Sequence, residues 1–180
     1  MDIRELTKDE LELIWTIDRS ETVDGIYHHA GDKLVLKTGH WDVRGWSASV
    51  RALQSALLEE CLDQGGTFYG AFEDDQLIGV AVLESRFIGR GKDQLQLKFL
   101  HVSRRNRNDG VGSRLFQKTV ERARDLGARR LYISATPSEN TVDFYLGLGC
   151  RVTNEVDPDL FDLEPEDIHL EFEVPRSNGE

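Results

Sequence analysis

Cysteine is scarce in this chain of 180 residues, and so are long apolar runs. Neither Cys61 nor Cys150 belongs to a Cys-x-x-Cys pair, so the sequence predicts no metal site and no disulfide framework, only two reduced, buried thiols. No apolar run approaches the ~20 residues of a membrane helix. The opening stretch, MDIRELTKDELELIW, has acids and lysine where a secretion signal is apolar. We therefore expect a cytoplasmic protein with no membrane contact.

Two familiar phosphate-binding patterns are also missing. The sequence contains neither a G-x-G-x-x-G that opens a βαβ unit nor a G-x-x-x-x-G-K-[ST] loop, which disfavours a dinucleotide fold and a P-loop fold. The formal net charge of −11 repels nucleic acid and anionic lipid, and the basic residues are not interleaved with aromatics. We expect no nucleic-acid partner and a preference for cations.

The charge is unevenly distributed. Nine bases and three acids lie between Arg104 and Arg130, whereas ten acids and one base lie from Glu155 onward. One end of the fold is thus suited to an anion and another to a cation.

The hydrophobic periodicity predicts one soluble domain over residues 1–180, with its core in about 1–174. Residues 22–46, rich in Gly and Trp, are interpreted as a loop or hairpin excursion. The remaining order, β α α βββ α β α ββ, is typical of an α/β fold with a mixed sheet. The expected strands lie at 3–6, 67–73, 77–89, 94–102, 128–137, 150–156 and 167–174, and the helices at 8–21, 47–66, 111–127 and 138–149.

Alternation within elements predicts which side chains are buried. In the strand at 94–102 the buried positions are Leu95, Leu97, Phe99 and then Leu100, and in the helix that follows they are Val111, Leu115, Thr119, Ala123 and Leu126. In the last strand Ile168, Leu170, Phe172 and Val174 alternate with His169, Glu171 and Glu173. This predicts one buried face and one exposed, acidic face.

The stretch RNDGVG, residues 107–112, joins an apolar strand to a helix. The first N–H groups of a helix have no intrahelical partner and carry partial positive charge, so they stabilise an anion. We expect Gly110 and Gly112 to let a phosphate approach the backbone closely. Four arginines add charge there: Arg104, Arg105, Arg107 and Arg114. By itself the glycine pair is equally consistent with a simple turn.

The run LKFLHVSRRNRNDGVGSRLF resembles the acetyl-CoA-binding segment of the GNAT superfamily of N-acetyltransferases, whose signature is [Q/R]-x-x-G-x-[G/A] after the fourth strand. The run SENTVDFYLGLGC is similar to a later helix of that family, with Cys150 in place of a final aromatic residue. The resemblance implies a GNAT-like fold, with a mixed, mostly antiparallel sheet of about seven strands that splays between strands four and five, and helices on both faces.

The resemblance also implies site residues. Backbone groups of Leu100, His101 and Val102 are expected to bind the pantetheine and the acetyl carbonyl, and the His101 side chain is expected to be structural. The pyrophosphate is expected on Arg107, Asn108, Asp109, Gly110, Val111, Gly112 and Ser113. Ser138 occupies the place of an asparagine that contacts the cofactor in many relatives, and Asn140 lies two residues later. Both residues are expected to contact the cofactor.

Tyr145 is the expected proton donor to the leaving thiolate, since a phenol stays protonated at neutral pH. The general base is harder to place. The family's positions for it fall at Gln96 and Lys98, which are poor bases, so a carboxylate elsewhere is required. Glu84 is the candidate adopted, with Glu21 or an acid of the last strand pair as alternatives.

Two functions remain open. The first is an acetyl-CoA-dependent N-acetyltransferase in which a primary amine, small or peptidic and cationic, attacks the thioester directly in a ternary complex. The second is a non-catalytic acyl-CoA-binding module. The edge of the last strands also makes a homodimer a possibility.

Overall fold

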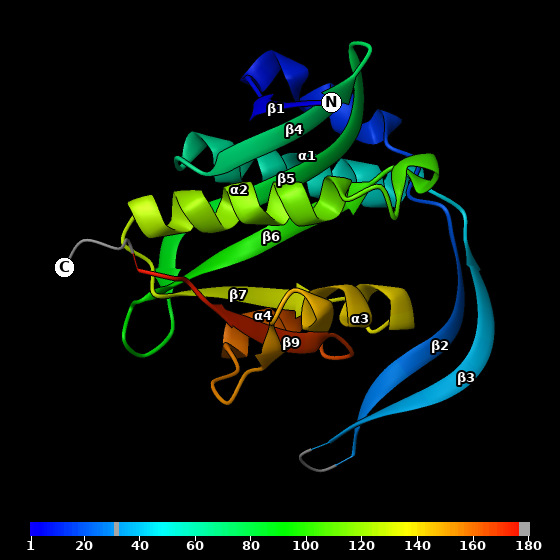
Figure 1. Cartoon of the computed structure of the whole chain (residues 1–180), viewed down its shortest axis with the longest axis vertical. Coiled ribbons are helices and arrows are strands. Elements are labelled where there is room, and N and C mark those ends of the chain that lie inside the picture. The colour runs from blue at the N-terminus through cyan, green and yellow to red at the C-terminus, as the bar shows by residue number, and fades with distance from the viewer. Residues whose placement is uncertain (31–32, 177–180) are drawn as a thin grey trace.

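A seven-stranded sheet organises the chain, in the strand order β1-β4-β5-β6-β7-β9-β8 (Figure 1). The computed structural model describes residues 1–30 and 33–176. The sheet strands are β1 (Asp2–Glu5), β4 (Thr67–Glu73), β5 (Gln76–Ile88), β6 (Gln94–Val102), β7 (Arg130–Ala135), β8 (Arg151–Val152) and β9 (Ile168–Glu173). A separate hairpin comprises β2 (Glu21–Ala30) and β3 (Lys33–Val43). The helices are η1 (Lys8–Thr16), α1 (Ala48–Asp63), η2 (Arg104–Asn106), α2 (Val111–Asp125), α3 (Glu139–Gly147) and α4 (Pro158–Leu163).

Helix ends follow the local sequence signals. The Ser47 hydroxyl caps α1 by accepting a hydrogen bond from the Val50 amide at 3.2 Å, and Gly65 ends the helix at a φ of +91°. Helix α2 begins after Gly110, whose φ of +78° is the left-handed conformation that glycine adopts without strain. The expected α/β class with a mixed sheet is confirmed.

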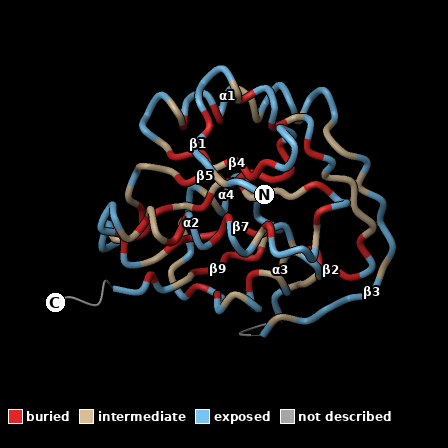
Figure 2. Tube along the Cα trace, turned by 45° about the horizontal axis from the view of Figure 1, so that its top comes forward, coloured by how far each residue is buried: buried red, intermediate tan, exposed pale blue. Residues whose placement is uncertain are grey.

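Helices cover both faces of the sheet. One core cluster joins α2 and α3 to β5, β6, β7 and β9, while the other joins η1 and α1 to β4 and β5. Figure 2 shows the central strands mostly buried and β3 mostly exposed. The α2 prediction is confirmed at Val111, Leu115, Thr119 and Ala123. It is wrong at Leu126, which is 37% exposed because α2 ends at Asp125.

The sheet opens between β6 and β7. These parallel strands pair only from Gln94 to Gln96, opposite Arg130 to Tyr132. Next to this opening Phe99 pairs with Val82 and Leu97 with Leu83, so Lys98 is an extra residue on β6, a β-bulge. The bulge reverses the alternation. Leu95, Leu97 and Leu100 pack in the α2 core, whereas Phe99 belongs to the opposite core, contrary to the regular alternation expected from sequence.

The stretch 22–46, for which the sequence left a loop or a hairpin open, is largely the β2–β3 hairpin. Its strand β2 lies against the start of α3 (Figure 1). The Tyr27 amide donates to the Pro137 carbonyl at 2.8 Å, and the Tyr27 hydroxyl donates to Asp143 at 2.8 Å. Ile26 also forms a bridge with Ser138. The hairpin therefore borders the open end of the sheet.

The last strands differ from the sequence-based expectation. Strand β8 has two residues, and helix α4 was not expected. The prediction of an exposed, acidic face on β9 is wrong at two positions, because His169 and Glu171 are each only 3% exposed. Tyr132, Phe161 and Thr153 contact them from the side that was expected to face solvent. Of His169, Glu171 and Glu173, only Glu173 is exposed.

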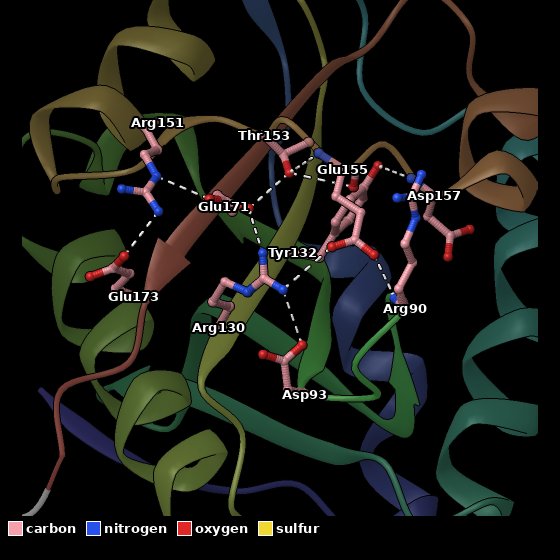
Figure 3. A network of polar contacts seen from close by, with 10 residues as sticks. All are labelled: Arg90, Asp93, Arg130, Tyr132, Arg151, Thr153, Glu155, Asp157, Glu171 and Glu173. Atoms are coloured by element: carbon pink, nitrogen blue, oxygen red, sulfur yellow. Dashed lines mark hydrogen bonds and ion pairs between the residues drawn. The ribbon is translucent and has the colours of Figure 1, made fainter.

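An ion network holds this region together (Figure 3). Glu171 accepts hydrogen bonds from Arg130 at 3.2 Å, Arg151 at 2.9 Å and the Thr153 hydroxyl at 2.8 Å. Arg130 also pairs with Asp93, in the β5–β6 connection, at 3.1 Å. The Arg130 side chain of β7 thus links β9 to the residue that precedes β6, at the end of the sheet where β6 and β7 still pair. The charge of the Glu171 carboxylate is neutralised by the two arginines.

Candidate active site

The N-terminus of α2 presents backbone donors at the end of β6. Its first intrahelical bond runs from the Arg114 amide to the Gly110 carbonyl at 3.1 Å, so the amides of Val111, Gly112 and Ser113 precede the helical ladder. A Cβ atom on Gly110 would meet nothing within 4 Å. Asn108 is also left-handed, with a φ of +68°. The turn is thus open and its donors are suited to an anion.

Gly112 also has a packing role, which the sequence did not indicate. A Cβ atom there would lie 3.1 Å from Cζ of Phe144 and 3.6 Å from a methyl group of Val102. Gly112 therefore lets α2 pack closely against α3 and β6.

The guanidinium groups around this turn are only partly neutralised. Arg107 donates to the Val102 carbonyl at 3.2 Å and lies 4.0 Å from the Glu21 carboxylate. Arg19, which the sequence analysis did not identify, stacks over Trp46, with its guanidinium carbon 4.7 Å from the centroid of the ring. Burial, and to a smaller extent the positive charge of Arg107, lower the pKa of Arg19, so an anion near both groups would be stabilised.

Asn140, the second cofactor-contacting candidate, donates to Glu21 at 2.9 Å. Glu21 of β2 therefore contacts both the turn before α2 and the first turn of α3. Ser138 is 4% exposed and donates to the Thr141 hydroxyl at 2.8 Å, so its side chain is engaged within α3. Arg107 and Asn140 lie together, whereas Ser138 does not offer a free hydroxyl.

The end of β6 offers backbone groups on one edge. Leu100, His101 and Val102 pair with Ala81, Val80 and Gly79 of β5. On the other edge the pairing with β7 stops at Gln96. The β7-facing groups of these residues are therefore outside any strand ladder. The His101 ring packs against Trp46 and Phe99, and burial followed by the charges of Arg19 and Arg107 lowers its pKa to about 3. The ring is neutral.

Tyr145 projects from α3 into the same core cluster as Leu100 and Val102. It is 6% exposed, with its ring against Phe116 and Phe144. Burial raises the pKa of its hydroxyl above the ordinary value, so the phenol stays protonated.

Glu84 lies on the other side of the opening. Lys98, the bulge residue, donates to Glu84 at 2.5 Å, and both side chains are largely buried. The pair lines a cavity of about 210 Å³ between α1, α4 and strands β5 and β6. Gln96 and Cys61 also line it, and burial raises the pKa of the Cys61 thiol to about 12, which makes it a poor nucleophile.

Within residues 1–30 and 33–176, no group of three or more His, Cys, Asp or Glu side chains is placed to hold a metal ion. No helix in these ranges is long and apolar enough to cross a membrane.

In this protein β6 separates from β7, and helix α2 begins just after the end of β6. This arrangement defines a class of α/β protein in which an extended, phosphate-bearing ligand fits between the two strands. The chain belongs to the acetyltransferase (GNAT) family, whose model matches residues 35–149. The expected family and fold are thereby confirmed.

Similarity to individual proteins agrees with this assignment. N-acetyltransferase 8B of Rattus norvegicus is 31% identical over 100 residues, which are 54% of this chain and 45% of that protein. The chain spans about half the length of the curated relatives that it matches. In fold it is similar to nourseothricin acetyltransferase, with a TM-score of 0.74, 18% identity and coverage of 97% and 98% of the two chains. It is also similar to PaiA N-acetyltransferase from Thermoplasma acidophilum, solved with coenzyme A, with a TM-score of 0.61, 17% identity and coverage of 96% and 98%.

Proposed function

We propose that this protein is an acetyl-CoA-dependent N-acetyltransferase that acts on a primary amine in a ternary complex. The observation that carries the proposal is the free edge of β6 leading directly to the open, donor-rich start of α2. This continuous arrangement suits a ligand with an extended amide chain at one end and a pyrophosphate at the other. Family membership and the coenzyme A bound to structural neighbours support the same ligand.

The anionic end of acetyl-CoA would lie on the amides of residues 107–113, with Arg107 and Arg19 supplying charge. The Arg107 contact with Glu21 is long, at 4.0 Å, so a phosphate can replace it. Backbone groups of Leu100, His101 and Val102 would hold the pantetheine and the acetyl carbonyl, where a fixed amide stabilises the charge that develops on oxygen. Asn140 would reach the ligand by leaving Glu21.

Tyr145 is the proposed acid. Its hydroxyl is protonated, and its side chain belongs to the core cluster against which Leu100 and Val102 of β6 pack, so it is proposed to give a proton to the leaving sulfur as the carbon–sulfur bond breaks. Glu84 is the proposed base, taking a proton from the incoming ammonium group before nitrogen attacks the carbonyl carbon. Lys98 orients the carboxylate by donating a hydrogen bond to one of its oxygens.

The acceptor is proposed to be a cationic amine that approaches from the side of α1 and α4. The net charge of −11 favours a cation. Since Glu171 is paired with arginines, this preference rests on the acids of the segment between β8 and β9, including Asp159 in the wall of the Glu84 cavity. A homodimer formed through β8 stays a prediction, and that edge strand offers only Arg151 and Val152.

The test is to incubate the purified chain with acetyl-CoA and a panel of primary amines and to follow free thiol by a chromogenic reagent. We expect amine-dependent thiol release, with acetylated amine identified by mass spectrometry. Calorimetric binding of acetyl-CoA without turnover on any amine would instead favour the acyl-CoA-binding module. Absence of any acetyl-CoA binding would refute both.

A further inference from the structure

A second cavity, of about 500 Å³, lies between α4, β9 and the end of β2. Its walls are largely apolar, and its polar groups are mostly titratable. The apolar lining residues are Val156, Pro158, Phe161 and Pro165, and the polar ones are His29, Asp162, Asp167 and His169. None of these residues is a proposed cofactor contact, acid or base of the acetyl transfer.

The cavity opens on the sheet face opposite α2. On β7 the side chains of Leu131 and Ile133 pack in the α2 core, so the alternate residues Tyr132 and Ser134 point to the other face. Ser134 pairs with His169 across the sheet and donates a hydrogen bond to Asp167 at 3.3 Å. This is the face on which Glu84 and Lys98 lie, but on the far side of the opening, across from β6.

His169 leaves a buried hydrogen-bond donor unused. Its Nδ1 is 2.7 Å from the Tyr132 hydroxyl, and the oxygen of that hydroxyl accepts a bond from the Asp157 amide at 3.1 Å. Burial raises the pKa of Tyr132 to about 12, so the phenol keeps its proton and can donate it to Nδ1. The proton of the His169 ring is then on Nε2, which is buried and has no partner in the described part of the chain.

Such a donor needs an acceptor. His169 lines the cavity, but its Nε2 is covered, so a ligand oxygen reaches this donor only when a neighbouring side chain moves. Leaving a buried N–H unpaired costs about 1–3 kcal/mol, which a ligand oxygen would recover. Phe161, whose ring centroid is 5.8 Å from that of His169, is 45% exposed and can move aside.

Asp167 provides the opposite chemistry. Burial, and then the neighbouring Glu164 carboxylate, raise its pKa to about 7. Near neutral pH the Asp167 carboxyl group therefore still retains part of its proton. The other groups around Asp167 are the Ser134 hydroxyl, Asp162 of α4, His29 of β2 and His169 of β9. An ammonium group in the cavity could take the place of the retained proton and pair with the Asp167 carboxylate.

We propose that this cavity binds an organic ammonium ion that carries an oxygen acceptor and an apolar body. The ammonium group contacts Asp167, the oxygen accepts from Nε2 of His169, and the apolar part lies against Phe161 and the two prolines. The site consists of residues outside the proposed cofactor site and does not require the proposed acetyl transfer. The ligand is either an acetyl acceptor or a separate cationic effector.

The experiment is calorimetric titration of the whole chain, without acetyl-CoA, with phenylalaninol and with the uncharged analogue 3-phenylpropan-1-ol. We expect phenylalaninol to bind at least about tenfold more tightly at pH 8, with an affinity about tenfold higher at pH 8 than at pH 6 as the retained proton is displaced. Asp167→Asn should weaken binding at least about tenfold. Asp125→Asn, which removes one charge at the exposed end of α2, should leave it unchanged.

Equal binding of the amine and the alcohol would overturn the proposal, as would an affinity that does not change between pH 6 and pH 8. If Asp167→Asn does not fold, these two measurements on the unsubstituted chain still decide. Acetylation of phenylalaninol when acetyl-CoA is added would identify the ligand as an acceptor. Binding without acetylation would identify a separate cation site. Because binding is measured without acetyl-CoA, failure of the proposed function would not affect the result.

Discussion

Gly112, at the start of α2, faces the ring of Phe144 on α3 so closely that a Cβ atom would lie 3.1 Å from Cζ. Gly110, two residues earlier, has open space around it but a φ of +78°. The two glycines of one turn are thus required for different reasons, one for packing and one for backbone conformation.

Substitutions separate these reasons. Gly112→Val should lower the free energy of unfolding by about 2 kcal/mol or more, because the added methyl groups overlap Phe144. Gly110→Ala should cost about 1 kcal/mol, the price of a left-handed alanine. Urea unfolding followed by circular dichroism gives both values. Equal losses for the two variants would contradict the distinction.

Glu171 and Glu173 lie two residues apart on β9 but differ in environment. Glu171 is buried between Arg130 and Arg151, and hydrogen bonds from Thr153 and Arg151 lower its pKa despite burial. Glu171→Gln should destabilise the fold by about 2 kcal/mol at pH 7, less than for a fully buried ion pair because both arginines are partly exposed. Glu173→Gln, at an exposed position, should change stability by less than about 0.5 kcal/mol.

The Glu171 effect should depend on pH in a defined direction. A carboxylate with a lowered pKa contributes stability above the ordinary glutamate pKa, and this contribution is lost as the pH falls through the folded value. The difference between Glu171→Gln and the unsubstituted chain should therefore shrink below a pH of about 4. A difference that grows in acid would contradict this assignment.

Asp167 should show the opposite pH dependence. Its pKa is raised, so the folded state holds a proton that the unfolded chain releases, and this stabilisation is lost as the pH rises toward about 7. Asp167→Asn, which has no proton to lose, should gain stability relative to the unsubstituted chain between pH 4 and pH 8. Thermal melts at several pH values would test this, with Asp125→Asn as the control. A constant difference would refute it.

Tyr145→Phe tests the proposed acid. The ring contacts with Phe116 and Phe144 are retained, so the thermal midpoint and the KM for acetyl-CoA should change little. Because a positioned proton donor contributes about a hundredfold or more, kcat should fall by at least that factor. Thiol-release kinetics would measure it. An unchanged kcat would remove Tyr145 from the mechanism.

The sequence predicted those features that depend on neighbouring residues. Ser47 and Gly65 mark the two ends of α1 as expected. The glycine turn before α2 was located from Gly110 and its flanking strand and helix. The family resemblance supplied the open sheet. Each of these signals is contained in a short stretch of chain.

Features that depend on distant contacts were not predicted. The alternation of β6 failed at Phe99 because the bulge at Lys98 is defined by pairing with β5. His169 and Glu171 were expected to be exposed because nothing in β9 shows that the segment containing α4 crosses over it. Asp157 followed by Pro158 is an N-cap and first-turn pair, and it could have indicated the missed helix.

The extra residue at Lys98 also has a genetic consequence. It is encoded by a single codon and lies just where β6 and β7 separate. Deleting that codon would join Leu97 directly to Phe99. Because these two residues already pair with the adjacent residues Leu83 and Val82, the ladder would then continue without a bulge, and the strand's last four residues would keep the sides that they face. A single in-frame deletion would thus remove the local bend at the opening while leaving the ligand-facing half of β6 in register.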